Sequence, residues 1–156
     1  MNDVPGTLAP PVFDRPVKVL IVAAGGGAAV QATLSAAQTA LADATVEVVW
    51  MPSVAEIACA ISLAERMADF DGYVAIGLIC GDGLTAEVEA REVTGALTSL
   101  GLRGAMVGNG VLIDEDSVHL IKNATTKGAQ AGAAALHLIA LSRKWATDTK
   151  GIGFRP

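Results

Sequence analysis

The sequence predicts an α/β protein, a three-layer α/β/α sandwich with a four-stranded, mainly parallel sheet in its middle layer. Short apolar runs rich in β-branched residues alternate along the chain with longer amphipathic segments, and this alternation is typical of parallel strands joined by crossover helices. The length of 156 residues suits one domain with a substantial core. In such sheets ligands bind beyond the carboxyl ends of the strands, so we expect the functional site there.

Each predicted strand is an apolar run, and each predicted helix has apolar residues at helical spacing. The apolar face of the second helix consists of Ile57, Ile61, Leu63 and Met67. Thr85 is the predicted N-cap of the third helix, with Glu87 and Glu89 in its first turn. A short helical turn is expected at residues 114–116. The predicted strands are 17–24, 45–52, 72–80 and 103–113, and the predicted helices are 28–44, 54–70, 85–100 and 127–145.

The chain is expected to form one domain with two flanking segments. Residues 1–16 hold four of the six prolines and predict an extended N-terminal arm that is poorly suited to join the sheet as a central strand. Residues 17–146 form the domain, and 147–156 are predicted to be a C-terminal tail. No internal repeat is present in the sequence.

Composition narrows the functional classes. Hydrophobic residues make up 52% of the chain and the mean hydropathy is +0.49, which indicates surface buried against partner subunits. A net charge of -5 without a basic stripe argues against nucleic acid as a partner. No apolar run is long enough for a membrane helix, and no secretory signal is recognised, so a cytoplasmic location is expected. Cys59 and Cys80 lie in apolar segments and are predicted to be buried thiols.

Neither a nucleotide motif nor a metal centre is predicted. The "GGG" turn after the first strand lacks the third glycine of the dinucleotide fingerprint, because Val30 occupies that position, and no P-loop lysine follows it. A tight turn that allows close helix packing is the simpler interpretation. His119 and His137, the two histidines, have no carboxylate or cysteine at ligand spacing. We therefore expect no metal and no cofactor.

Four segments in order resemble motifs of the 6,7-dimethyl-8-ribityllumazine synthase family. "MPSVAEIACA" resembles the family's Val-Pro-Gly-Ala-aromatic-Glu-Ile-Pro, and "VAIGLICGDG" resembles its Ala-Leu-Gly-x-Val-Ile-Arg-Gly-Asp/Glu-Thr. "VGNGVLIDED" resembles Gly-Asn-Gly-Ile-Leu-Thr-x-Glu-Asn, and "TTKGAQAGAAAL" resembles the Lys-Gly-x-x-Ala-Ala segment of the last helix. The resemblance extends from about residue 17 to residue 146.

The resemblance implies a flavodoxin-like, lumazine synthase-like architecture and a transferase of riboflavin biosynthesis. Members condense a ribitylaminopyrimidinedione with a four-carbon hydroxyketone phosphate to give 6,7-dimethyl-8-ribityllumazine. They form homo-oligomers, pentamers that often assemble further into decamers or sixty-subunit shells, with the site between neighbouring subunits. A phosphate or another small molecule is the implied ligand. A deletion before Lys127 further implies a short bend between the last two helices.

Several family residues are replaced in this chain. The family histidine falls at Thr85, and the arginine before the glycine turn is missing because Cys80 directly precedes Gly81. The stacking aromatic falls at Gly26, and the hydrophobic residue before the family glutamate falls at Ala55. A phosphate-binding arginine or histidine falls near Asn123. Thr85 cannot take up a proton near neutral pH as an imidazole can.

Other family residues are matched. Glu56 corresponds to a family glutamate that contacts the polyol part of the substrate. The turn of Gly81, Asp82 and Gly83 corresponds to the family turn whose backbone amides face phosphate. Asn109 and Lys127 also match. Two simpler roles remain open: Glu56 as a first-turn acid beside a capping Ser53, and Lys127 as a capping or paired residue at a helix end.

Three functions follow from these matches and replacements. The leading hypothesis is an oligomeric assembly or small-molecule-binding protein of this family without efficient lumazine synthesis. The second is a functional 6,7-dimethyl-8-ribityllumazine synthase in which Glu87, Glu89 or His119 supplies proton transfer. The third is a different enzyme that acts on a phosphorylated or carbonyl compound in the same site.

Overall fold

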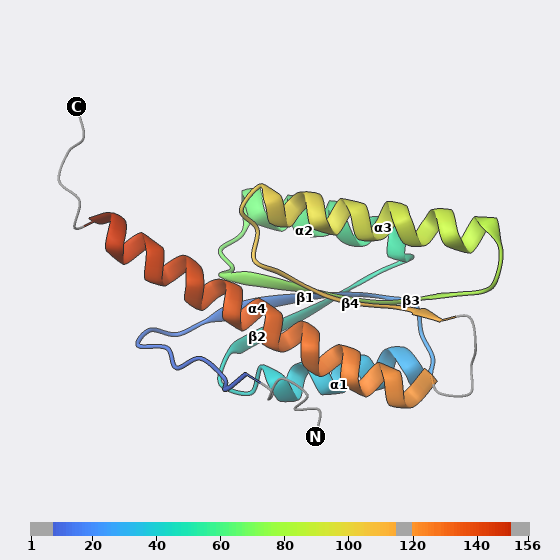
Figure 1. Ribbon diagram of the computed structural model, residues 1–156, viewed down its shortest axis with the longest axis horizontal. Helices are drawn as coiled ribbons and strands as arrows, with labels where there is room; N and C mark the ends of the chain where they lie inside the picture. Colours follow the sequence, from blue (N-terminus) through green and yellow to red (C-terminus); the bar gives the residue numbers. More distant parts are fainter. Residues whose placement is uncertain (1–7, 115–119, 151–156) are drawn as a thin grey trace, which may run out of the picture.

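The computed structural model describes residues 8–114 and 120–150. A parallel sheet in the order β2-β1-β3-β4 forms the middle layer, with α1 and α4 on one face and α2 and α3 on the other (Figure 1). The predicted three-layer α/β/α fold is confirmed, and every strand pair in the sheet is parallel. The elements are β1 (Lys18–Ala24), α1 (Ala28–Ala40), β2 (Thr45–Met51), the short 3-10 helix η1 (Val54–Glu56), α2 (Ile57–Met67), β3 (Gly72–Cys80), α3 (Leu84–Leu102), β4 (Val107–Asp114) and α4 (Leu120–Lys150).

Alternating side chains of the central strands create two cores, one on each face of the sheet. Along β1, Leu20 and Val22 face α2 and α3, whereas Val19 and Ile21 face α1 and α4. All four side chains are buried. This two-sided burial explains why β1 and β3 are almost continuously apolar in sequence.

Glycines allow α4 to approach its neighbours closely. A Cβ atom at Gly108 of β4 would meet the backbone carbonyl of Ala131 in α4, and one at Gly128 of α4 would meet the carbonyl oxygen of Thr33 in α1. Gly132 is similarly close, since its Cβ would lie 3.0 Å from the Ala37 carbonyl oxygen. Side chains at these positions would force the backbones apart, so the α4 packing distance depends on glycine.

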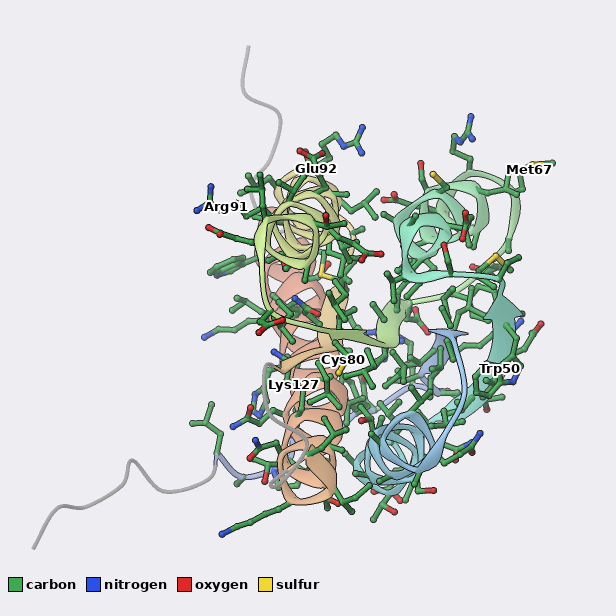
Figure 2. The ribbon with its side chains drawn as sticks, turned by 90° about the vertical axis from the view of Figure 1, so that its right-hand side faces the viewer. Trp50, Met67, Cys80, Arg91, Glu92 and Lys127 are labelled. Carbon is green, nitrogen blue, oxygen red and sulfur yellow. The ribbon has the colours of Figure 1, made fainter. Side chains whose placement is uncertain are left out.

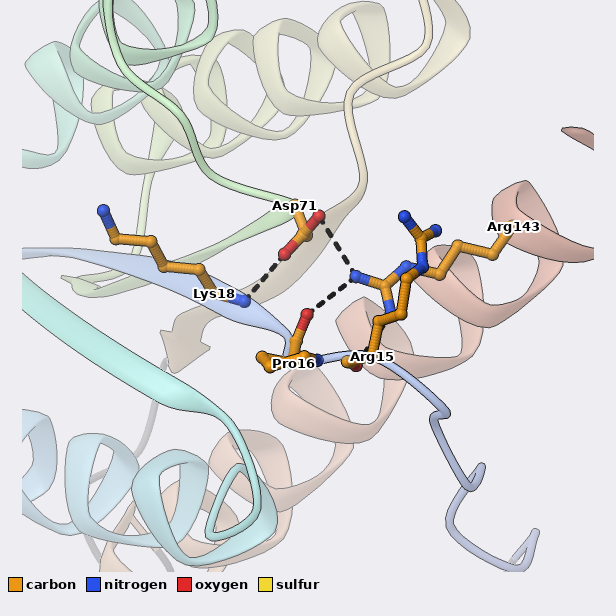
Figure 3. Close-up of polar contacts among 5 residues, drawn as sticks. All are labelled: Arg15, Pro16, Lys18, Asp71 and Arg143. Atoms are coloured by element: carbon orange, nitrogen blue, oxygen red, sulfur yellow. Dashed lines mark hydrogen bonds and ion pairs between the residues drawn. The ribbon is translucent and has the colours of Figure 1, made fainter.

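The segment before β1 is tied to α4 by Arg143 (Figure 3). Its guanidinium donates to the carbonyl oxygens of Arg15 (3.0 Å) and Pro16 (2.9 Å) and forms an ion pair with Asp71 at 3.3 Å. Asp71 also accepts a hydrogen bond from the backbone N–H of Lys18 at 2.8 Å. One arginine thereby joins the N-terminal segment, the start of β3 and the last helix.

The boundaries of several elements differ from prediction, and α1 ends at Ala40 and α2 at Met67 rather than at residues 44 and 70. β4 begins at Val107 rather than at residue 103, because α3 extends to Leu102 and Gly104 (φ 108°) makes a turn after it. α4 begins at Leu120 and continues to Lys150, so the expected bend between two last helices is absent from residues 120–150. Asp114 ends β4, whereas residues 115 and 116 of the predicted helical turn lie outside the described residues.

Two expectations about side chains were wrong. Cys59 and Cys80 are free and exposed, because Cys59 lies on the side of α2 away from Ile57 and Ile61 and Cys80 is the last residue of β3. On α2 only Ile57 and Ile61 are buried, and Leu63 and Met67 are exposed.

Within the described part of the chain, no helix combines the length and apolar character required to cross a membrane.

Candidate functional site

The two central strands end in similar glycine turns. β1 and β3 are neighbours, and each leads into a helix whose N-cap is a glycine with positive φ, Gly27 (94°) for α1 and Gly83 (106°) for α3. Neither helix has a side-chain cap, so the predicted capping role of Thr85 is wrong. The first-turn N–H groups of both helices are available to a ligand, and the helix dipoles favour a negatively charged one.

A cavity of about 320 Å³ lies at the carboxyl ends of β1, β2 and β3. Gly26, one of the predicted site residues, lines it, and Ser53 and Glu89 contribute polar groups. Glu89 of α3 is the one titratable residue among the described residues that line this cavity. The remaining lining residues are Ala24, Gly25, Val30, Pro52, Val54 and Leu78.

Glu56 takes part in a capping box at the start of η1. Its carboxylate accepts hydrogen bonds from the Ser53 hydroxyl (2.6 Å) and the Ser53 backbone N–H (2.9 Å). The Ser53 Oγ in turn accepts from the backbone N–H of Ala55 at 3.3 Å, which confirms the predicted cap. The hydrogen bond from the Ser53 side chain holds the pKa of Glu56 below its ordinary value of 4.5. Glu56 lines a groove between α2 and β2 rather than the cavity that contains Gly26.

The glycine turn after β3 opens onto another surface. Gly81 and Gly83 line a groove of about 730 Å³ that runs along α3. Glu87 and Arg91 lie in this groove and form an ion pair at 2.6 Å. Asp82, the middle residue of the turn, is exposed. The groove therefore combines turn amides with a paired surface charge.

The remaining predicted residues lie on the β4 side of the molecule. Lys127 and Asn123 are one helical turn apart on α4 and line a cavity of about 290 Å³ together with Lys122, which sequence reasoning missed. The sequence signal that could have indicated this site is the pair of lysines five residues apart on one helix. Asn109 lies in a separate groove between α3 and α4, and its Oδ1 accepts a hydrogen bond from the Val111 backbone N–H at 3.0 Å.

Two of the positions at which family residues are replaced are exposed to solvent. Thr85 is exposed in the first turn of α3, and Ala55 is exposed in η1. His137 is half-buried on α4 and lines none of the cavities described above. His119 lies outside the described residues. Among the described residues, therefore, no imidazole lies at the carboxyl ends of the strands.

One copy of the chain does not gather the predicted residues into a single site. Gly26, Glu56, the glycine turn, Asn109 and Lys127 line five different cavities or grooves. Lys127 and Cys80 lie on one side of the molecule and Trp50 on the other (Figure 2). Sequence order alone could not reveal this separation, since it depends on where β2 and β4 stand in the sheet.

The fold, the glycine turns and the order of the candidate residues agree with one family model. The model described as 6,7-dimethyl-8-ribityllumazine synthase matches residues 16–143. The chain belongs to this family. The region matched by the family model includes all four strands and most of α4.

Individual lumazine synthases cover most of the chain. This chain is 40% identical over 155 residues to the 6,7-dimethyl-8-ribityllumazine synthase of Jannaschia sp. (strain CCS1), and the aligned region covers 94% of this chain and 86% of that protein. This chain is 37% identical over 119 residues to the 6,7-dimethyl-8-ribityllumazine synthase of Novosphingobium aromaticivorans, and the aligned region covers 72% of this chain and 86% of that protein. 6,7-dimethyl-8-ribityllumazine synthase 1 of Rhizobium meliloti is 33% identical over 144 residues, covering 83% and 94%.

Proposed function

We propose that this chain is a working lumazine synthase that condenses a ribitylaminopyrimidinedione with a four-carbon hydroxyketone phosphate. The observation that carries the proposal is the 40% identity to a protein of that name over 94% of the chain. The glycine-capped starts of α1 and α3 add physical support, because their free amides suit an anionic reactant. The exposed, unpaired thiols of Cys59 and Cys80 are compatible with the reducing cytoplasm.

The proposed reaction is slow. A positioned general acid or base typically contributes ~10² to 10⁴ in rate, and Thr85 cannot fill that role as an imidazole would. Binding both reactants side by side still accelerates condensation, because it removes much of the entropic barrier. We therefore expect a rate above that of the free reactants and below that of relatives with a histidine at this position.

A complete site requires a second copy of the chain. The residues that line the carboxyl ends of β1, β2 and β3 and those around Lys127 are separated within one protomer. Lys122 and Lys127 would supply positive charge for the phosphate of one reactant from a neighbouring copy. A homo-oligomer built on pentamers is the assembly that we propose.

The function is tested by mixing the two reactants with the purified protein and following 6,7-dimethyl-8-ribityllumazine by its absorbance. Formation at least tenfold faster than without protein is the expected result. Lys127→Ala should raise the KM for the phosphorylated reactant, whereas Lys144→Ala on the same helix should not. A rate equal to that of the free reactants would refute the proposed synthase.

A second candidate is a non-catalytic or repurposed binding protein. The observation that favours it is the exposed Thr85 with no imidazole at the strand ends among the described residues. In that case thermal shift measurements should show stabilisation by a small molecule or by phosphate, since a ligand of the folded state raises the melting temperature. Condensation would then stay at the background rate.

A further inference from the structure

The cavity at the carboxyl ends of β1, β2 and β3 contains one carboxylate among its described lining residues, that of Glu89. Its walls are otherwise apolar side chains, glycine backbone and Ser53. The Ser53 hydroxyl is already engaged with the Glu56 carboxylate at 2.6 Å and the Ala55 N–H at 3.3 Å. We propose that Glu89 of α3, in the cavity shared with Gly26 and Ser53, is the acid–base group of the condensation; this rests on the proposed synthase function.

Helix geometry separates Glu89 from the other acid at the start of α3. Residues two positions apart on a helix point about 200° apart, so Glu87 and Glu89 flank the buried stripe of Ala90 and Val93 on opposite sides. Glu87 faces the groove along α3 and is paired with Arg91 at 2.6 Å. Glu89 faces the cavity that contains Gly26.

Glu89 is also chemically available. Within the described part of the chain, no cation forms an ion pair with its carboxylate. The side chain is exposed, so it can exchange protons with solvent between turnovers. Gly25 and Gly26 place no side chain in front of it, and a Cβ at either position would meet no atom within 4 Å. The cavity thus leaves room for a reactant beside the carboxylate.

The proton transfers balance without any further reagent. The amine nitrogen of one reactant adds to the ketone carbon of the other, which forms a C–N bond and moves the C=O π electrons to oxygen. The Glu89 carboxylate takes a proton from nitrogen and returns it to that oxygen. A second transfer of the same kind, from nitrogen to the hydroxyl, expels water and leaves a C=N bond. Amine and ketone become imine and water, and the carboxylate is regenerated.

Glu89→Gln keeps the size of the side chain and removes its ability to take up a proton. We expect the protein-dependent kcat to fall roughly 100-fold with little change in either KM. Glu89→Asp should retain part of the activity. The matched control is Glu92→Gln on the same helix, since Glu92 points away from the sheet (Figure 2) and lines none of the five cavities and grooves described above.

Chemical rescue separates proton transfer from a structural role. Formate added to Glu89→Ala should restore activity in proportion to its concentration, and formate should leave Glu92→Ala unchanged. Circular dichroism and the melting temperature confirm that the variants fold. Unchanged kcat in Glu89→Gln, loss of activity in Glu87→Gln instead, or loss in Glu89→Ala without rescue by formate would each overturn the role of Glu89. A wild-type protein without condensation above background would instead refute the synthase function itself.

Discussion

The side chain of Glu56 shows how one residue type admits two interpretations. Its place in the family motif predicts a contact with substrate, whereas in the structure its carboxylate closes a capping box with Ser53. The two roles are compatible only if a ligand reaches the carboxylate without breaking the 2.6 Å and 2.9 Å hydrogen bonds. A structural role for Glu56 therefore has a measurable consequence of its own.

The stability contribution of Glu56 should depend on pH. Because its pKa is lowered in the folded state, the contribution is present above its ordinary value of 4.5 and is lost as the pH falls through the folded-state pKa. Wild type should therefore be more stable than Glu56→Gln at pH 7, and the difference should shrink on acidification. Urea unfolding of both proteins across this range measures it. A stability difference that stays constant across this pH range would contradict a capping role for the Glu56 carboxylate.

At the scale of elements, α4 is held by close backbone contacts as well as by the buried side chains of Leu136 and Ile139. It packs on α1 through Gly128 and Gly132 and on β4 through Gly108. Such close approach leaves little freedom to adjust, so α4 presents Lys122 and Lys127 at a defined height over β4. The residues of the β4-side cavity are thus positioned by glycines that lie elsewhere.

Gly108→Ala should be strongly destabilising. The added methyl group would meet the Ala131 carbonyl, a backbone atom that cannot rotate away, and we expect a loss of roughly 3 kcal/mol in the free energy of unfolding. The control is Gly101→Ala near the end of α3, where a Cβ would meet no atom within 4 Å. There the higher helix propensity of alanine should leave stability unchanged or raise it by up to about 1 kcal/mol. Equal effects in chemical denaturation would contradict the close packing of α4.

At the scale of the whole molecule, two different apolar surfaces lie on opposite sides. Met67 of α2 is 79% exposed, and Trp50 of the edge strand β2 is also exposed. Leu84 and Leu102, the latter 85% exposed, lie on α3. The labelled α3 residues Arg91 and Glu92 lie on the other side of the molecule from Met67 and Trp50 (Figure 2). Because the two surfaces are not alike, a contact between them is heterologous, and repetition of such a contact can close a ring.

Head-to-tail association makes a specific prediction about mixtures. We propose that the side of one copy that carries Met67 contacts the side of the next copy that carries Leu102. Met67→Glu and Leu102→Glu should then each abolish the assembly, because each places a charge in one half of that contact. Mixed together, the two variants retain one intact pair of surfaces and should form a heterodimer. Native mass spectrometry distinguishes these states. An assembly that survives either substitution alone would place the subunit contact elsewhere.

Much of the fold could be read from the sequence because its signals are local. The apolar runs of β1 and β3, the helical spacing on α1 and the Ser53 cap all depend on neighbours within a few residues. Residues 120–126 of α4 were not predicted to be helical, because the resemblance implied a bend before Lys127. The exposure of Cys59, Cys80 and Met67 was missed because an apolar residue carries no mark of the side it will face.

The sequence alone determined the α/β class, the order of the elements and the family, since these depend on periodicity and on motifs along the chain. Only the tertiary structure decided which residues meet. It brought Glu89 to the cavity beside Gly26 and placed Glu56 and Lys127 in other cavities and grooves. The reason is that the direction of a side chain depends on how far each helix is rotated over the sheet, and packing across the whole domain sets that rotation.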